Sequence, residues 1–482
     1  MIQSGKRNTR CALLVAAALG IAGNVLAQPA QPAPEPPANP EPANPANPPS
    51  DQPAAPANPP AAEAPPVAAP PPAAAPAMAP PATAYPTMAG PALKLSDLFT
   101  WRPGVFLQIW GSFVQDVNKQ TNGDAGDFAR NMYLRRARFF MGGTIGSSLS
   151  YFLLWESANN GSPTADAMGV VSKNNTTFAF NDAFLDFKVS PNLSVQAGLM
   201  LIPFTRNILQ STSTYWTLDI GGVSATYIGV TQTNVLRDTG AQVKVNALEN
   251  HLEIRGMVSE GVRLPDLTAS AANPPTAVAR NAGKNNPRLT AFAQYNFLDP
   301  DAGYVFNGQY FGRKKILALA GGVDWQPINS DNPYFATSAT LAAAIPIHGA
   351  DPKNGDDEVG GQIEYLHFHG GGAAAGSQVS ALNKQNALLA ELGYYNKAAK
   401  LEVFGKFEGR FYDVADTNPA AAVIKAGNAR IYGVGLKYFL AEQIANLTLM
   451  YSLTQAPDLP ATTAALRNDS NAIQLQLQVG YF

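Results

Sequence analysis

The chain has 482 residues, of which 46% are hydrophobic and only 14% are charged, and it contains 41 glycines and 40 prolines. Soluble domains carry about 25% charged residues, so this composition argues against an ordinary soluble domain. The net charge is −2, and we expect no nucleic-acid partner. The single cysteine, Cys11, excludes an internal disulfide.

Residues 1–27 read as a secretory signal peptide. Three basic residues, Lys6, Arg7 and Arg10, precede the apolar run Cys11–Val25, and Val25-Leu26-Ala27 is a suitable cleavage end. Beyond this run the sequence has no stretch of 18 or more apolar residues, which is the length typical of a transmembrane helix. The mature chain is therefore predicted to be exported and to lack a membrane helix.

Residues 28–93 are rich in proline and alanine and contain no lysine or arginine. Such a segment cannot bury a hydrophobic core, so we predict a disordered, extended, polyproline-like linker. It is either a passive spacer or a tether that crosses the periplasm and contacts peptidoglycan. The remaining residues, 94–482, are predicted to form one domain.

The stretch Asn181–Phe204 shows the pattern that runs through this domain. From Asp182 to Val189 the even positions carry most of the polar groups and the odd positions are apolar, and Ser190-Pro191-Asn192 is a turn signal before a second alternating run. Each run has about ten residues, enough for a tilted strand to cross a bilayer. The stretch is therefore predicted to be a membrane-spanning β-hairpin.

The same period of two recurs from Val105–Gln115 to Asn471–Phe482 and predicts sixteen strands. Apolar faces must contact lipid and charged faces must line the interior, so the fold class is all-β, a transmembrane antiparallel β-barrel. Alternation places Arg136 and Arg138 on the inner face and Arg135 on the outer face. Connections alternate short and long, except that 298–313 and 346–357 are longer than expected.

Ten charged residues are the predicted pore-lining set. Either they create a field across the pore that orients solutes and sets ion preference, or they pair between strands and stiffen the wall. Residues 202–237 form either a constriction loop inside the barrel or an external loop. The predicted pore-lining residues are Arg136, Arg138, Glu156, Asp182, Asp186, Lys188, Arg206, Lys406, Glu408 and Arg410.

Three motifs resemble the phosphate-selective porin O and P family: YLRRARFFMGG at 133–143, DAFLDFKVSPNLSVQAG at 182–198 and RDTGAQV at 237–243. The resemblance implies a sixteen-stranded outer-membrane porin, often trimeric, with the loop after the fifth strand folded into the pore. The family usually has a lysine near Pro203-Phe204, and this chain has none between Gly198 and Phe204. Phosphate selectivity therefore does not follow from the resemblance.

We expect no enzyme activity, metal or cofactor. The sequence contains no H-E-x-x-H, G-x-S-x-G or G-x-x-x-x-G-K-[ST] motif. His367 and His369 lack a third ligand in sequence, and the acidic run from Asp351 to Glu358 does not match an EF-hand, so a solvated loop is the better interpretation.

The sequence predicts a passive diffusion porin of the bacterial outer membrane. Its predicted partners are the lipid bilayer, small polar solutes or inorganic ions, including anions such as phosphate, and two further copies in a homotrimer. The alternative function is a structural outer-membrane anchor that tethers the envelope through its proline-rich arm.

Overall fold

The computed structural model describes residues 92–115, 128–165, 171–222, 236–261, 286–327, 333–369, 384–413, 428–455 and 469–481. All of them belong to one compact unit. The predicted signal peptide and nearly all of the proline-rich linker lie outside the described residues, so these two assignments stay predictions. Within the described residues, no helix is long and apolar enough to cross a membrane.

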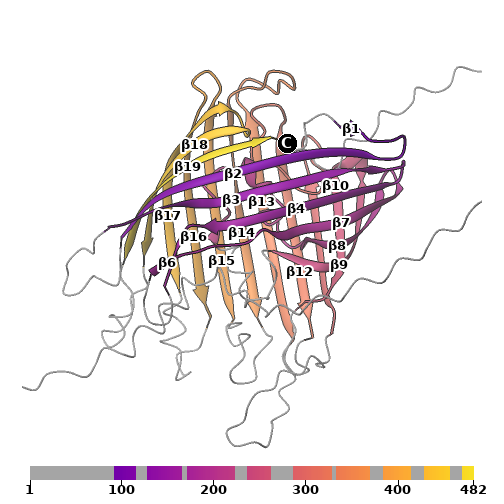
Figure 1. Ribbon diagram of the computed structural model, residues 1–482, viewed down its shortest axis with the longest axis horizontal. Helices are drawn as coiled ribbons and strands as arrows, with labels where there is room; N and C mark the ends of the chain where they lie inside the picture. The colour runs from indigo at the N-terminus through magenta and orange to yellow at the C-terminus, as the bar shows by residue number, and fades with distance from the viewer. Residues whose placement is uncertain are drawn as a thin grey trace, which may run out of the picture. The chain divides into compact units, whose positions relative to one another are not determined.

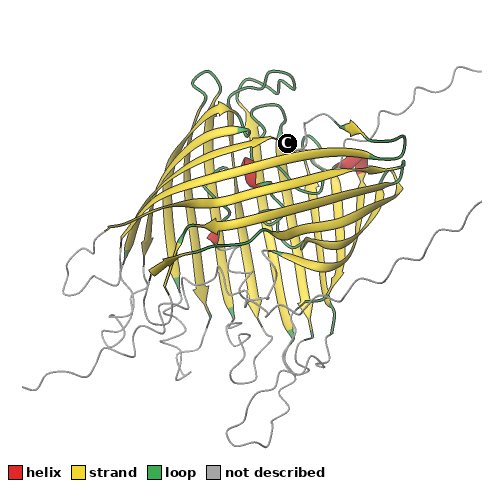
Figure 2. Cartoon of the chain, in the orientation of Figure 1, coloured by secondary structure: helices red, strands yellow, loops and turns green. Residues whose placement is uncertain are grey.

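Almost all regular structure in the described residues is β-strand (Figure 2). Besides Gly222, the exceptions are two single 3₁₀ turns, Thr212–Thr214 and Leu248–Asn250. Three strands are short: β1 (Leu93–Lys94), β5 (Pro163–Ala165) and β6 (Val171–Lys173). The sixteen long strands are β2 (Thr100–Gln115), β3 (Phe128–Ile145), β4 (Leu149–Asn160), β7 (Ala179–Ser190), β8 (Leu193–Leu201), β9 (Arg237–Ala247), β10 (Leu252–Ser259), β11 (Arg288–Asn296), β12 (Ile316–Gln326), β13 (Tyr334–Pro346), β14 (Glu358–His369), β15 (Gln385–Asn396), β16 (Leu401–Tyr412), β17 (Ala429–Ala441), β18 (Ala445–Gln455) and β19 (Ser470–Tyr481).

The sixteen long strands form a closed barrel (Figure 1). Each is hydrogen-bonded antiparallel to the strands before and after it, and the last strand, β19, pairs with the first, β2, through partners such as Gln476 and Trp110. Closure leaves no long strand with an unpaired edge, which is what a sheet surrounded by lipid requires. The predicted all-β transmembrane antiparallel barrel of about sixteen strands is confirmed.

The side chains of β11 illustrate the inverted polarity of the wall. Buried and exposed residues alternate along the whole strand. The buried set faces inward and is mostly polar, including Arg288 and Gln294, whereas Leu289 and Tyr295 are exposed on the outside. Because successive side chains on a strand point to opposite faces, this pattern separates an apolar outer surface from a polar interior.

The two ends of the barrel differ in their connections. Short turns such as 191–192 and 397–400 lie at the end that also holds the start of β2 and the end of β19, which we call the turn end. Connections 297–315 and 347–357 at this end are long, and the structure explains why. The first folds into the barrel, and the second hydrogen-bonds to it, from Asp351 N–H to the carbonyl of Gly312 (3.1 Å).

Candidate functional site

Two segments fold into the barrel from opposite ends. The loop insert, residues 202–222, follows β8 at the opposite end from the turns, and the turn insert, residues 297–315, joins β11 to β12 at the turn end. The apolar side chains where the inserts meet are almost inaccessible: Phe204 and Leu209 are 0% exposed and Phe306 is 1% exposed. The prediction that the loop after the fifth long strand enters the barrel holds for 202–222, whereas 223–235 lies outside the described residues.

The two inserts meet inside the barrel and bond to each other. The Ser211 N–H donates to the carbonyl of Phe306 (2.7 Å), and the Phe306 N–H donates to the carbonyl of Leu209 (2.8 Å), which makes a short parallel bridge. Arg206 donates to the carbonyl of Asn307 (2.9 Å) and lies 4.9 Å from the centre of the Phe306 ring. Backbone groups that would otherwise be buried without partners are thereby satisfied.

Charged side chains of the wall hold the turn insert in place. Arg255 donates to the carbonyls of Gly303 and Tyr304, both at 2.8 Å. On the other side of the insert, Glu358 accepts the N–H groups of Tyr310 (3.0 Å) and Gly312 (2.7 Å). Here charged groups from the barrel wall bind main-chain groups of the insert, an arrangement that neither of the two sequence interpretations of the charged set foresaw.

The loop insert is anchored by a different part of the wall. Lys437 donates to the carbonyls of Tyr215 (2.6 Å) and Trp216 (3.1 Å), and the Thr217 hydroxyl donates to Glu391 (2.6 Å). Trp216 is only 1% exposed, because its indole lies against the backbone of β14 and β15. These strands carry glycine at the contact, Gly360 and Gly393, and a Cβ on Gly393 would lie 2.5 Å from the indole.

A Gly393→Ala substitution is therefore expected to lower the free energy of unfolding by about 1–3 kcal/mol, the usual cost of overpacking. The matched control is Gly256→Ala, because a Cβ on Gly256 meets nothing within 4 Å. Urea unfolding of the purified protein in detergent micelles, followed by tryptophan fluorescence, measures both variants. Equal stabilities for the two would show that Trp216 does not fill this glycine gap.

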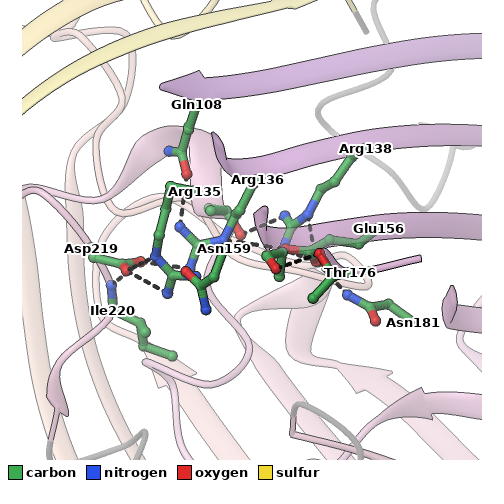
Figure 3. Close-up of polar contacts among 12 residues, drawn as sticks. Gln108, Arg135, Arg136, Arg138, Glu156, Asn159, Thr176, Asn181, Asp219 and Ile220 are labelled. Atoms are coloured by element: carbon green, nitrogen blue, oxygen red, sulfur yellow. Dashed lines mark hydrogen bonds and ion pairs between the residues drawn. The ribbon is translucent and has the colours of Figure 1, made fainter. Parts of the chain in front are cut away.

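A β-bulge changes the predicted direction of one arginine. Gln108 pairs with Arg136 and the next residue, Ile109, pairs with Leu134, so Arg135 is the extra residue. A bulge places consecutive side chains on the same side of a strand, and Arg135 and Arg136 both point inward (Figure 3). The prediction that Arg135 faces outward is wrong, because strict alternation assumes an uninterrupted strand.

Both arginines bind one carboxylate of the loop insert. Arg135 donates to Asp219 Oδ2 through Nε (3.0 Å) and Nη2 (2.8 Å), and Arg136 donates to Oδ1 through Nη2 (2.6 Å) (Figure 3). Next to them, Arg138 pairs with Glu156 (2.8 Å) and also donates to Thr212 of the loop insert (2.9 Å). The basic cluster on β3 thus anchors the segment that narrows the barrel.

The other predicted pore-lining residues are distributed around the interior. Asp182 pairs with Arg237 (3.0 Å), and Asp186 accepts from Gln196 (3.0 Å). Lys188, by contrast, is exposed beside the turn that follows β7. The remaining members are Arg206 on the loop insert, the ion pair Lys406–Glu408, and Arg410, which lies over the Tyr412 ring.

Several interior charges were missing from the predicted set, among them Arg237, Glu391, Glu402 and Lys437. Lys437 lies on β17 between Leu436 and Tyr438, both of which are exposed on the outside. Alternation along β17 was the available signal for this residue. No local sequence pattern indicated that Arg135 points inward, because the bulge that turns its side chain inward depends on the pairing of β3 with β2.

The acidic connection at the turn end does not gather its carboxylates around one point. Asp351 accepts the N–H groups of Lys353 and Asn354, both at 3.0 Å, and Glu358 faces the turn insert. Asp356 hydrogen-bonds to His348 and raises the pKa of that histidine. In the part of the chain that the structure describes, no three His, Cys, Asp or Glu side chains are grouped as metal ligands.

Residues 105–264 match the family described as Phosphate-selective porin O and P. No curated protein sequence matches the chain significantly. The anion-selective porin of Comamonas acidovorans is 12% identical, covering 79% of this chain and 99% of its own, with a TM-score of 0.48. The outer-membrane channel DcaP of Acinetobacter baumannii is 13% identical (80% and 99% covered, TM-score 0.47), and OprB of Pseudomonas putida is 9% identical (80% and 94%, TM-score 0.49).

The family match contains all three motifs from which the resemblance was read, since they lie between residues 133 and 243. It also spans the basic cluster of β3 and the whole loop insert. The resemblance is confirmed: residues 105–264 of this closed barrel are similar to the family of phosphate-selective porin O and P.

Proposed function

We propose that this porin passes ions and small polar solutes by passive diffusion with weak ion selectivity, and that it catalyses no reaction. The observation that carries the proposal is the pairing of charges inside the barrel. Arg135, Arg136 and Arg138 of β3 each form an ion pair with Asp219 or Glu156, and Arg237 pairs with Asp182. Selective anion binding needs cationic donors that are free to bind the solute, and paired arginines are poor donors.

Planar-bilayer recordings of the purified protein test this proposal. We expect stable conductance steps, reversal potentials close to zero in a KCl gradient, and only weak block by inorganic phosphate. The absence of steps would contradict the channel function. Tight phosphate block would contradict weak selectivity and would favour the phosphate preference that the family description suggests.

One observation favours the second candidate function, a structural anchor in the outer membrane. The two inserts fold into the barrel and pack there, with Phe204, Leu209 and Phe306 at most 1% exposed, so part of the interior is filled. A barrel that holds the envelope needs no open passage. A cell-wall pull-down with and without residues 28–93 tests this function, and loss of peptidoglycan binding on deletion would support it.

The family resemblance also implies a homotrimer, which we propose on that ground. Size-exclusion chromatography with light scattering in detergent would show a mass of three chains. A monomer that nevertheless forms conductance steps would overturn this proposal without affecting the channel function.

A further inference from the structure

The Asp219 carboxylate occupies the space between two guanidinium groups that come from consecutive residues of one strand. The three hydrogen bonds from Arg135 and Arg136 are 2.6–3.0 Å long and reach both of its oxygens. The backbone N–H of Ile220 donates a fourth hydrogen bond, to Oδ1 at 2.9 Å. This is the set of donors that an oxyanion would need, and here a residue of the chain itself supplies the anion (Figure 3).

The wall positions the two arginines independently of Asp219. Arg135 donates through Nη1 to Asn159 (3.0 Å) and lies over the indole ring of Trp110 at 5.2 Å. Arg136 donates through Nη1 to Gln108 (2.7 Å). Because each guanidinium has a second partner on the barrel wall, the pair keeps its place when Asp219 loses its charge.

The charges of this cluster do not cancel completely. Arg135, Arg136 and Arg138 carry three positive charges, and their carboxylate partners are Asp219 and Glu156. The side chains of Arg135 and Asp219 are 19% and 14% exposed, whereas those of Glu156 and Arg136 are 3% and 7% exposed. Of the two carboxylates, Asp219 is therefore the more exposed.

We propose that Asp219 is the residue that keeps this porin weakly selective, by acting as a built-in counter-ion in an oxyanion site made by Arg135 and Arg136. The inference rests on the proposed channel function and deepens it. A passing oxyanion must displace a carboxylate that is already bound and tethered. Without that carboxylate, the same donors bind the solute.

The loop insert has enough other anchors to stay in place without Asp219. Thr212 accepts from Arg138, Thr217 donates to Glu391, and Lys437 binds the carbonyls of Tyr215 and Trp216. An Asp219→Asn substitution keeps the size of the side chain and removes only its charge. Its main effect is therefore expected on selectivity and not on the position of the loop.

Planar-bilayer recordings of wild-type protein and Asp219→Asn test the inference, with KCl as the carrier salt and inorganic phosphate as the probe. We expect a several-fold rise in the chloride-to-potassium permeability ratio. We also expect the phosphate concentration that halves the current to fall about tenfold, which corresponds to about 1.4 kcal/mol, because the freed guanidinium groups form charge-assisted hydrogen bonds with phosphate. Asp219→Ser carries the same expectation and serves if the asparagine variant does not fold.

Three controls make the result specific to this site. Asp219→Glu keeps the charge and is expected to behave like the wild type. Asp351→Asn removes one carboxylate from an exposed turn and is expected to leave phosphate block unchanged. Adding Arg135→Gln to Asp219→Asn is expected to abolish the gained block, which assigns that block to the arginine pair.

Two outcomes have different meanings. If the wild-type protein shows no conductance steps, the proposed channel function itself is contradicted. The second outcome is that the wild type shows steps and that Asp219→Asn raises the conductance without changing the permeability ratio or the phosphate block. This outcome overturns only the present inference, because Asp219 would then merely anchor the loop insert.

Discussion

Replacing residues 300–314 with Asn-Gly is expected to raise the single-channel conductance several-fold. The replacement removes most of the turn insert, including Tyr304 and Phe306, which are 2% and 1% exposed in the interior. It leaves the hairpin of β11 and β12 closed, since pairing reaches Asn296 with Ala318 and the Asp299 N–H donates to the carbonyl of Lys315 (2.9 Å). A wider passage follows because the conductance of a pore depends on its narrowest section.

This change would not leave the wall residues that bind the turn insert buried without a partner. Arg255 and Glu358 would face a water-filled space instead of the insert, so they would be hydrated and would cost little free energy. Single-channel recordings in KCl measure the effect, and Lys353→Gln is the control because Lys353 is exposed on the neighbouring connection, outside the insert. A correctly folded variant with wild-type conductance would show that the turn insert does not limit the passage.

Asp324→Ala is expected to cost about 3–5 kcal/mol of unfolding free energy, the usual cost of removing one partner of a buried ion pair. Asp324 and Arg288 have side chains with 0% exposure and are joined by two hydrogen bonds, at 2.8 and 2.5 Å. Thr290 also donates to Asp324 (2.9 Å). Without the carboxylate, the guanidinium of Arg288 loses its charged partner in a place that water does not reach.

The control is an ion pair of the same type on the surface. Lys384 and Asp413 lie 2.7 Å apart, but their side chains are 54% and 52% exposed. Exposed pairs contribute about 0–1 kcal/mol, so Asp413→Ala is expected to be nearly neutral. Urea unfolding in detergent micelles compares the two. Equal losses would mean that Arg288 is hydrated and that the interior at this level is less tightly packed than the structure shows.

The barrel wall was predictable from residue order because it depends on a local rule. A strand between lipid and a polar interior must alternate, as Arg288–Asn296 does, and each strand shows this pattern whatever its neighbours are. The strand count and the fold class therefore followed from the period of two. The lengths of connections 298–313 and 346–357 also showed that something unusual happens at the turn end, although not what it is.

The side-chain contacts inside the barrel could not be predicted from the sequence, because they join residues that lie far apart along the chain. Arg135 binds Asp219, 84 residues away, and Lys437 binds Tyr215, 222 residues away, so no local pattern reports either contact. Even the direction of Arg135 depends on its register with β2. Alternation along each strand specified the barrel wall and its polarity. The closing of the barrel brings distant charged residues and the two inserts together, so it decided how the interior is filled and which arginines bind Asp219.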